Sequence, residues 1–362
     1  MGVVRLPDSS STITQARPAP LAPASRRARI TRDGTPGLRL LGVLGAALAV
    51  AFILNTAVCL LPENDYQRWQ LQDPDGRLRW IYERIHFDPR PIDVAIVGPS
   101  REHLGLSAAM IEQDLAQQGK QANVVNFALP GAGRDIQWAI LNELFRAKSP
   151  KVLVLGVEDQ PYPFGHFFFK YVAPAEAIVF PPSPFLHNYF YNLAYLPIRK
   201  LKLFGANLFP DLFGLSKQFD PDHYARNRTD YSTSFIGDGK LVDMEHPVPR
   251  STLLAEPREP VPRTLVARLL TRLNGGEDHL FTEKIAREAK AHGAKLVFVH
   301  LPMFEGPTTV SDEDFLKQFG PVLNYGDLAP HDELFENWSH LNHAGAMNAS
   351  ARLADAVAGL GL

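Results

Sequence analysis

The sequence predicts an α/β protein: a three-layer domain built on a parallel sheet, interrupted by a long insertion and preceded by one transmembrane helix. Short β-branched runs alternate with helical patterns from residue 92 onward, which is typical of such a sheet. Residues 160–275 break that alternation with proline and aromatic side chains. Residues 40–61 form an uncharged apolar run. The 362 residues leave room for one large domain or two small ones.

Overall composition excludes several classes of protein. With 45% hydrophobic and 21% charged residues, the chain is neither wholly disordered nor fibrous. The net charge of −2 provides no basic field, so we expect no nucleic-acid partner. Cys59 is the one cysteine, which excludes an intrachain disulfide and a cysteine-cluster metal site. We expect no cofactor and no metal.

The N-terminal head differs in charge from the body of the chain. Residues 1–39 contain seven arginines and two aspartates, a net charge of +5, whereas the remainder has a net charge of −7. Five prolines fall within residues 1–36, among Ser, Ala and Arg. We therefore expect residues 1–39 to be a disordered basic tail. A basic head on an acidic body is typical of a chain that meets a membrane.

Residues 40–61, LLGVLGAALAVAFILNTAVCLL, are 22 residues without a charge. About 20 apolar residues span a bilayer core as a helix. The arginines precede this run and Glu63 and Asp65 follow it, so the positive-inside rule places residues 1–39 in the cytoplasm and 62–362 outside it. A cleaved signal peptide would have a shorter apolar region, of about 7–15 residues. An organelle transit peptide is the other alternative. We expect an uncleaved single-pass anchor in the cell membrane.

The remaining elements follow from hydrophobic periodicity. Residues 62–91 are expected to be a linker, and the α/β domain to comprise 92–159 and 276–362. Short apolar runs predict strands at 92–97, 124–127, 151–155 and 295–299. Helical spacing predicts helices at 106–118 (capped by Ser107), 135–147, 277–291 and 344–358.

The insertion, residues 160–275, is expected to have little regular structure. It holds 14 of the 30 prolines between 161 and 262, and 16 of the 36 aromatic residues between 160 and 220. A hairpin is predicted at 234–242 around an Asp-Gly turn. Three interpretations of the aromatic residues stay open: a satellite core, packing on the bilayer interface, and a sugar-binding wall.

Polar signals stand at or beyond the carboxyl ends of the predicted strands, where ligands of parallel α/β sheets bind. Ser100 follows the first strand, and a serine there projects into the crevice with its own N–H free for an oxyanion. Asn126 is followed by Gly131 and Gly133, whose backbone can approach a substrate closely. His340 precedes the last helix and can serve as a general base.

In this order the motifs resemble the SGNH, or GDSL-type, hydrolase superfamily. The resemblance is to its membrane-anchored branch in envelope polysaccharide O-acyl modification, similar to proteins of alginate O-acetylation and teichoic acid D-alanylation. It covers roughly 90–160 and 277–360 and implies a three-layer SGNH/flavodoxin-like domain. The matching residues are Gly98-Pro99-Ser100 with Arg101 and Gly105-Leu106, then Gly131 five residues after Asn126, then Asn337-x-x-His340 with His-Leu-Asn and Gly345.

The resemblance implies an activity and roles for these residues. Ser100 would attack an acyl ester, with His340 as base and the N–H groups of Ser100 and Gly131 as the oxyanion hole. A working pair requires the Ser100 hydroxyl and the His340 ring within about 2.6–3.2 Å. The acyl group would pass to water or to a sugar hydroxyl. The expected partner is an envelope polysaccharide or an acyl donor protein.

The chain departs from the family pattern in its third block. The family has Gly-x-Asn-Asp, and its Asn donates to the oxyanion. Here the block is Gly156-Val157-Glu158-Asp159, and an ionised Glu158 cannot donate. Loss of one oxyanion donor costs about 10²–10³ in rate.

The second departure is Asn337, where the family has Asp. An amide can orient the imidazole of His340 but cannot stabilise its cation with charge. Register favours Asn337 as a neutral orienting group, with Glu336, Asp332 or Glu333 as alternative acids. These departures motivate a rival hypothesis, a catalytically decayed SGNH-like scaffold or a glycan-binding or assembly protein of the envelope. A metal site from His331, Asp332, His340 and His343 is a weaker alternative, because their spacing matches no defined motif.

Overall fold

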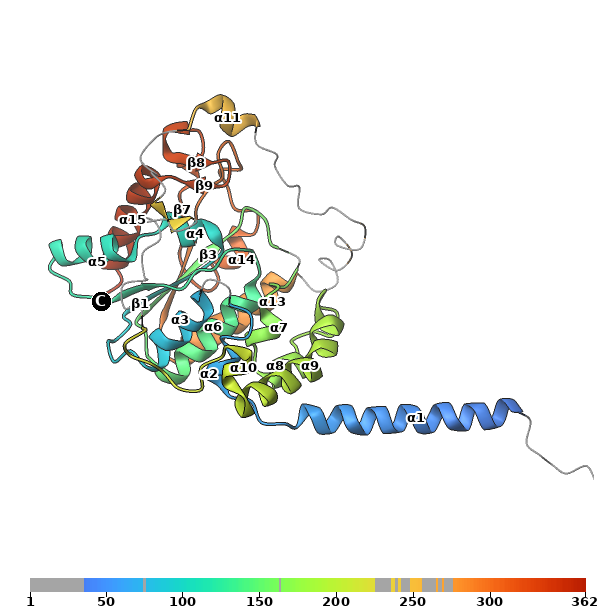
Figure 1. Ribbon diagram of the computed structural model, residues 1–362. Coiled ribbons are helices and arrows are strands. Elements are labelled where there is room, and N and C mark those ends of the chain that lie inside the picture. The colour runs from blue at the N-terminus through green and yellow to red at the C-terminus, as the bar shows by residue number, and fades with distance from the viewer. Residues whose placement is uncertain are drawn as a thin grey trace, which may run out of the picture. The chain divides into compact units, whose positions relative to one another are not determined.

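A parallel sheet of five strands organises the chain (Figure 1). In this computed structural model the strands are ordered β2-β1-β3-β6-β7, and each neighbouring pair is parallel. Their bounds are β1 Val94–Val97, β2 Val124–Asn126, β3 Val152–Val157, β6 Lys295–His300 and β7 Val322–Asn324. The four predicted strands are confirmed. The edge strand β7 was not predicted, because its three residues are half-buried and carry no run of apolar side chains.

The structure describes residues 36–73, 76–162, 164–224, 248–255 and 276–362, with 236–237, 240–241, 265 and 269 as short pieces. Two units are distinguished, Met1–Ile53 and Leu54–Leu362. In the second unit, side chains alternate between the two faces of the sheet. On β1, Ala95 and Val97 join one core, and Val94 and Ile96 join the other.

Helices cover both faces, as expected for three layers. One face is covered by α5 (Ala108–Gln117) and α15 (His343–Ala358), and the other by α3 (Arg77–His86), α6 (Arg134–Ala147) and α13 (Glu277–Ala291). The predicted cap of α5 is confirmed, since the Ser107 hydroxyl accepts a hydrogen bond from the Met110 N–H at 3.2 Å. The coarse α/β prediction therefore holds.

The prediction of a linker at 62–91 is wrong. The segment forms α2 (Asp65–Arg68) and α3, and its Trp69 and Trp80 are fully buried in the core. Arg68 is also buried, in an ion pair of 3.1 Å with Glu143 of α6. Paired charges of this kind interrupt the apolar pattern, so periodicity does not show that the segment belongs to the domain.

The prediction of little regular structure in the insertion is wrong for its first part, which is largely helical. Residues 169–213 form α7 (Phe169–Val172), α8 (Ala175–Val179), α9 (Tyr189–Leu208) and α10 (Pro210–Phe213), and α11 (Arg250–Ala255) follows later. Pro197 lies inside α9, where proline normally argues against a helix. Several aromatic residues of the insertion, among them Phe169 and Tyr224, join the main core. Ile236–Gly237 (β4) pairs antiparallel with Lys240–Leu241 (β5), as the predicted hairpin requires.

The helix α1 (Pro36–Cys59) contains the apolar run. Within the described residues, one helical segment, Leu40–Cys59, is long enough and apolar enough to cross a membrane. Residues 1–35 of the predicted disordered tail lie outside the described residues, and the prediction is wrong for residues 36–39, which belong to α1.

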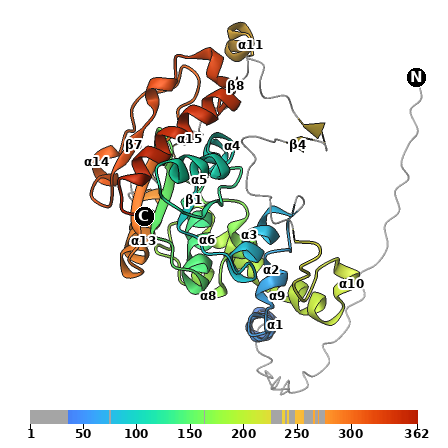
Figure 2. The ribbon, with the colours of Figure 1, turned by 90° about the vertical axis from the view of Figure 1, so that its left-hand side faces the viewer.

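Short elements at the carboxyl edge of the sheet hold the candidate residues. The helix α4 (Ser100–Gly105) follows β1 directly. The hairpin of β8 (Phe335–Asn337) and β9 (His340–Leu341) precedes α15, after α14 (Glu313–Leu316) and the 3-10 turns η1 (Gly326–Leu328) and η2 (Asp332–Leu334). Figures 1 and 2 place α4 and β8 at one end of the domain, and α2, α9 and α10 at the other.

Candidate active site

Ser100 and His340, which are 240 residues apart, are in hydrogen-bond contact. The Ser100 Oγ lies 2.8 Å from the His340 Nε2, inside the distance range expected for a nucleophile and its base. Ser100 is the first residue of α4, because β1 ends at Val97 and, after Gly98, Pro99 caps the helix without a side-chain hydrogen bond. His340 opens β9, on the return strand of the hairpin. Both side chains are half-buried.

Asn337 holds the other nitrogen of the imidazole. Its Oδ1 lies 3.0 Å from the His340 Nδ1, and it also accepts the backbone N–H groups of Ser339 at 2.9 Å and of His340 at 3.0 Å. Backbone N–H groups only donate, so they identify the atom facing the ring as the amide oxygen. The His340 Nδ1 must then carry the proton, which leaves the Nε2 lone pair facing Ser100.

Ser339 is a member of this cluster that sequence reasoning missed. Its hydroxyl donates to the Asn337 Oδ1 at 3.0 Å and lies 3.0 Å from the His340 Nδ1, which can donate to it. The sequence signal was the Asn-x-Ser turn itself, since an Asn side chain commonly accepts the N–H two residues on. This turn closes the hairpin that presents His340.

The imidazole of His340 is held neutral. Burial, and then the positive charge of Arg101, lower the pKa of His340 to about 4. The ring is therefore unprotonated at neutral pH and can accept a proton at Nε2. Its hydrogen bonds go to Ser100, Asn337 and Ser339, and none of these partners is a carboxylate. Asn337 thus occupies the orienting position that register predicts.

Arg101, next to Ser100, is the centre of a buried ion-pair cluster. Its guanidinium forms a close ion pair with Glu158, lies 3.4 Å from Asp159, and donates to the Leu301 carbonyl at 2.7 Å. Asp159 in turn lies 2.5 Å from the buried His300. Burial alone would raise the pKa of Asp159, but the hydrogen bond from His300 and the charge of Arg101 lower it. The Glu158 carboxyl is thus occupied by its ion pair with Arg101.

Asn126 has a structural role in this structure. Its amide N–H groups donate to the carbonyls of Glu102 at 2.8 Å and Leu106 at 2.9 Å, and its oxygen accepts the Ala128 N–H at 2.9 Å. The side chain therefore ties the middle of α4 and its C-terminal cap residue to the end of β2. It positions Ser100 through that helix and has no amide hydrogen left for a substrate.

Gly131 lies in the loop between β2 and α6, under the imidazole of His166. Its φ is +94°, and a Cβ there would come within 2.9 Å of the His166 Nε2. That nitrogen lies 2.9 Å from the Pro130 carbonyl, and the His166 N–H donates to Asp135 at 2.8 Å. His166, from the start of the insertion, thus fixes the loop that carries Gly131, and only glycine fits beneath it.

Glu102 is fully buried two residues after Ser100. Neither carboxylate oxygen has a hydrogen-bond partner within the described residues. Burial raises the pKa of Glu102 to about 7, against the opposing charge of Arg101. Its side chain packs on Gly98 and Gly156, where a Cβ would come within 2.7 Å and 2.3 Å of it respectively. These two glycines make room for a carboxyl beneath the candidate site.

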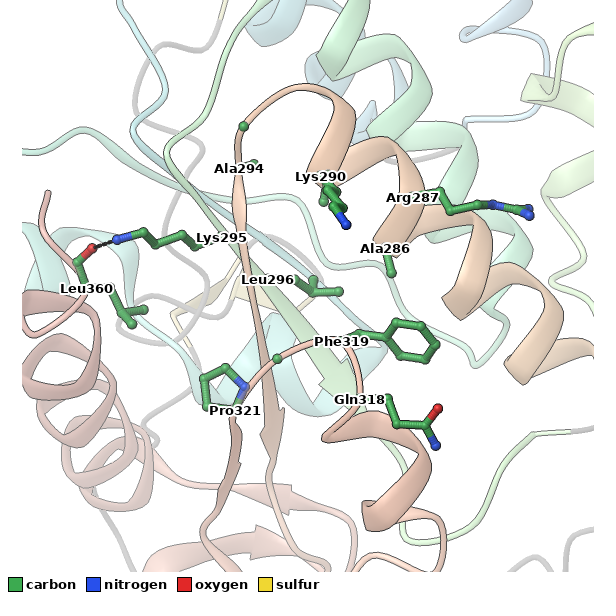
Figure 3. A pocket seen from close by; sticks show the side chains of 13 residues that line it. Ala286, Arg287, Lys290, Ala294, Lys295, Leu296, Gln318, Phe319, Pro321 and Leu360 are labelled. Carbon is green, nitrogen blue, oxygen red and sulfur yellow. Dashed lines mark hydrogen bonds between the residues drawn. The ribbon is translucent and has the colours of Figure 1, made fainter.

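Two further features lie apart from the Ser100–His340 pair. His331 pairs with Glu333 at 3.1 Å, both exposed, and within the described part of the chain no three metal-ligating side chains gather. A pocket of about 790 Å³ lies at the amino end of β6, between α13 and the segment before β7 (Figure 3). Arg287, Lys290 and Phe319 line it, and no candidate catalytic residue does.

Comparison with known proteins leaves the family open. No family model matches the chain, and no curated protein is significantly similar to it. What the fold and geometry define is a parallel α/β domain with a serine and a neutral histidine in contact at its carboxyl edge.

Proposed function

We propose that this protein is a membrane-anchored SGNH-like serine esterase or O-acyltransferase, acting on acyl esters of cell-envelope or extracellular polysaccharide. The observation that carries the proposal is the 2.8 Å contact between the Ser100 Oγ and the His340 Nε2, with the opposite nitrogen held by Asn337. Nucleophile, base and orienting group in one chain of hydrogen bonds are what covalent acyl transfer requires.

The reaction follows from these three groups. As the Ser100 Oγ bonds to the acyl carbon, its proton passes to the His340 Nε2, and a tetrahedral oxyanion forms. The C–O bond to the leaving alcohol then breaks, and His340 returns the proton to that alcohol. Water or a sugar hydroxyl next attacks the acyl-enzyme, giving its proton to His340, and Ser100 leaves with that proton. The N–H groups of Ser100 and Gly131 are the proposed oxyanion donors.

The envelope location rests on the first 65 residues. The apolar helix Leu40–Cys59 would be the anchor, and the arginine-rich head before it would stay in the cytoplasm. The domain would then face the periplasm or the cell exterior, where envelope polysaccharides lie. A reporter active only outside the cytoplasm should work when fused after residue 362 and fail when fused before residue 30. The reverse pattern would overturn the envelope substrate.

A catalytically decayed scaffold, or a glycan-binding or assembly protein, is the second candidate. Two observations favour it: Glu158 is tied up in an ion pair with Arg101, and the residue behind His340 is a neutral amide. Both would weaken stabilisation of the transition state without disturbing the fold.

Labelling with a fluorophosphonate probe separates the two candidates. The full-length protein should be labelled at Ser100, and Ser100→Ala should abolish labelling and hydrolysis of an acyl ester. Ser251→Ala, at an exposed position on α11, serves as the matched control and should be labelled like the wild type. Circular dichroism of both variants checks folding. If the folded wild-type protein neither reacts with the probe nor turns over any ester, the enzyme proposal is refuted and the scaffold candidate is supported.

A further inference from the structure

The helix α9 exposes an apolar stripe that no described part of the domain covers. The stripe consists of Phe190, Ile198, Leu201 and Leu208, and it continues into Phe209 and Leu212 beyond the helix end. Spacings of 8, 11 and 18 residues from Phe190 return to the same side of an α-helix. Phe190 is 74% exposed and Leu212 is 81% exposed. We call these six side chains the α9 face.

The opposite side of α9 is fixed to the segment that follows the apolar helix α1. Arg199 is fully buried and bonds Glu63 at 3.0 Å, and Lys200 donates to the Leu61 carbonyl at 3.0 Å. Nearly two turns further along α9, the Gln67 side chain of α2 donates to the Ala206 carbonyl at 3.2 Å. The helix α9 is therefore anchored to residues 61–67, which begin two residues after the last residue of α1.

From this we infer that the α9 face lies in the interface of the bilayer that α1 crosses. The inference rests on the proposed membrane anchoring of residues 40–61. Each polar interface of a bilayer is only about 5–8 Å thick, and two extended residues reach about 7 Å. Leu61 therefore stands at headgroup depth, and α9, whose Lys200 donates to the Leu61 carbonyl, stands there as well.

The chemistry of the α9 face suits lipid. Interfacial helices place an apolar side about 5–10 Å into the boundary of headgroups and acyl chains. Arg199 and Lys200 of α9 are already paired with Glu63, and the exposed Lys202 lies 3.4 Å from the Tyr195 hydroxyl. Continuity with the anchor favours the bilayer over a second copy of the chain or another protein.

Contact between the α9 face and the bilayer would fix how the candidate active site is oriented relative to the membrane. The elements α4 and β8 lie at the end of the domain away from α9 and α10 (Figures 1 and 2). With the α9 face on the bilayer, the end of the domain that holds α4, whose first residue is Ser100, lies away from the lipid. A polymer reaching out from the envelope then meets the site more readily than an acyl chain held in the membrane.

The test uses the full-length chain with single labelled cysteines in a Cys59→Ala background. Phe190→Cys and Leu212→Cys carry an environment-sensitive nitrobenzoxadiazole label, in vesicles of phosphatidylethanolamine and phosphatidylglycerol. Leu254→Cys, on α11 and 50% exposed, is the matched control, and Leu48→Cys reports on the anchor. Quencher-bearing lipids should remove more than about half of the emission at 190, 212 and 48, the first two at interfacial depth, and little at 254.

The outcomes separate the two proposals. Quenching at 48 together with emission at 190 and 212 that matches 254 would overturn the inference and leave the anchor standing. Absence of quenching at position 48 would refute the proposed membrane anchor, and the inference about the α9 face would fail with it. Blue-shifted emission at 190 and 212 that resists lipid quenchers would show that protein covers the face, which also overturns the inference.

Discussion

Replacing Asn337 by Asp isolates the missing charge at the candidate site. The Asn337 Oδ1 accepts two backbone N–H groups and faces the Nδ1 of His340 at 3.0 Å. A carboxylate oxygen keeps all three contacts, because each of them only requires an acceptor. Asn337→Asp therefore adds a negative charge next to the imidazole and leaves the hairpin turn in place.

The size of the effect follows from this contact. A carboxylate within a few ångströms raises the pKa of a histidine by about 1–3, and here it starts from about 4. Each pKa unit corresponds to about 1.4 kcal/mol of stabilisation of the imidazolium. If the transition state carries the full imidazolium charge, the same stabilisation speeds the reaction about 10–10³-fold. The converse change in a serine protease costs about 10⁴, through the wrong tautomer. Our gain is smaller because Asn337 already enforces the productive tautomer.

The assay is turnover of a p-nitrophenyl acetate ester by full-length wild type and Asn337→Asp, across pH 4–9. The variant should show higher kcat with little change in KM, and the acid limb of its profile should move to higher pH. Asn64→Asp is the matched control, since the Asn64 Oδ1 also accepts a backbone N–H, that of Gln67 at 3.2 Å, at the start of α2 and away from the Ser100–His340 pair.

An unchanged rate for Asn337→Asp would refute this reasoning. If Glu336→Gln or Asp332→Asn abolished turnover instead, the acid would come from one of those side chains. A rise in rate without movement of the acid limb would mean that the added charge acts on something other than His340.

Four further outcomes are expected. Ester turnover should fall as pH drops through about 4, where His340 gains its proton; a midpoint above 6 would contradict this. Arg101→Gln should destabilise the fold by about 1–3 kcal/mol in urea unfolding, because the buried Asp159 keeps its contact with His300 but loses the Arg101 cation. Glu102 keeps its proton in the folded state up to about pH 7, against an ordinary pKa of 4.5. The free energy of unfolding of the wild type should therefore fall by about 3 kcal/mol as the pH rises between these two values, because the buried carboxyl must lose its proton. Glu102→Gln has no such proton to lose, so its free energy of unfolding should fall less than that of the wild type between pH 5 and 8. Gly131→Ala should lower kcat more than tenfold, whereas Gly119→Ala, equally strained at φ +76° but in open space, should lower only stability, by about 1–2 kcal/mol.

Buried strands were the most predictable part of the fold. Runs such as Val94–Val97 are apolar on both faces, so their pattern shows a parallel strand without any tertiary information. The segment 62–91 was missed for the opposite reason. Arg68 and Glu143 are both buried, and each depends on a partner 75 residues away in sequence. A buried charge in the sequence looks the same as an exposed one until its partner is known.

The sequence by itself determined the four central strands, the helices α5, α6, α13 and α15, and the candidate residues Ser100, Asn337 and His340, because periodicity, the strand-end serine and the Asn-x-x-His spacing are local patterns. Only the tertiary structure decided what those residues contact. The 2.8 Å distance between Ser100 and His340 depends on β1 and the β8–β9 hairpin meeting at one edge of the sheet. The pairing of Glu158 with Arg101, the burial of Glu102 and the exposure of the α9 face likewise depend on packing between distant segments. Local sequence encodes φ, ψ and periodicity, whereas contacts across many residues are set by how whole elements pack.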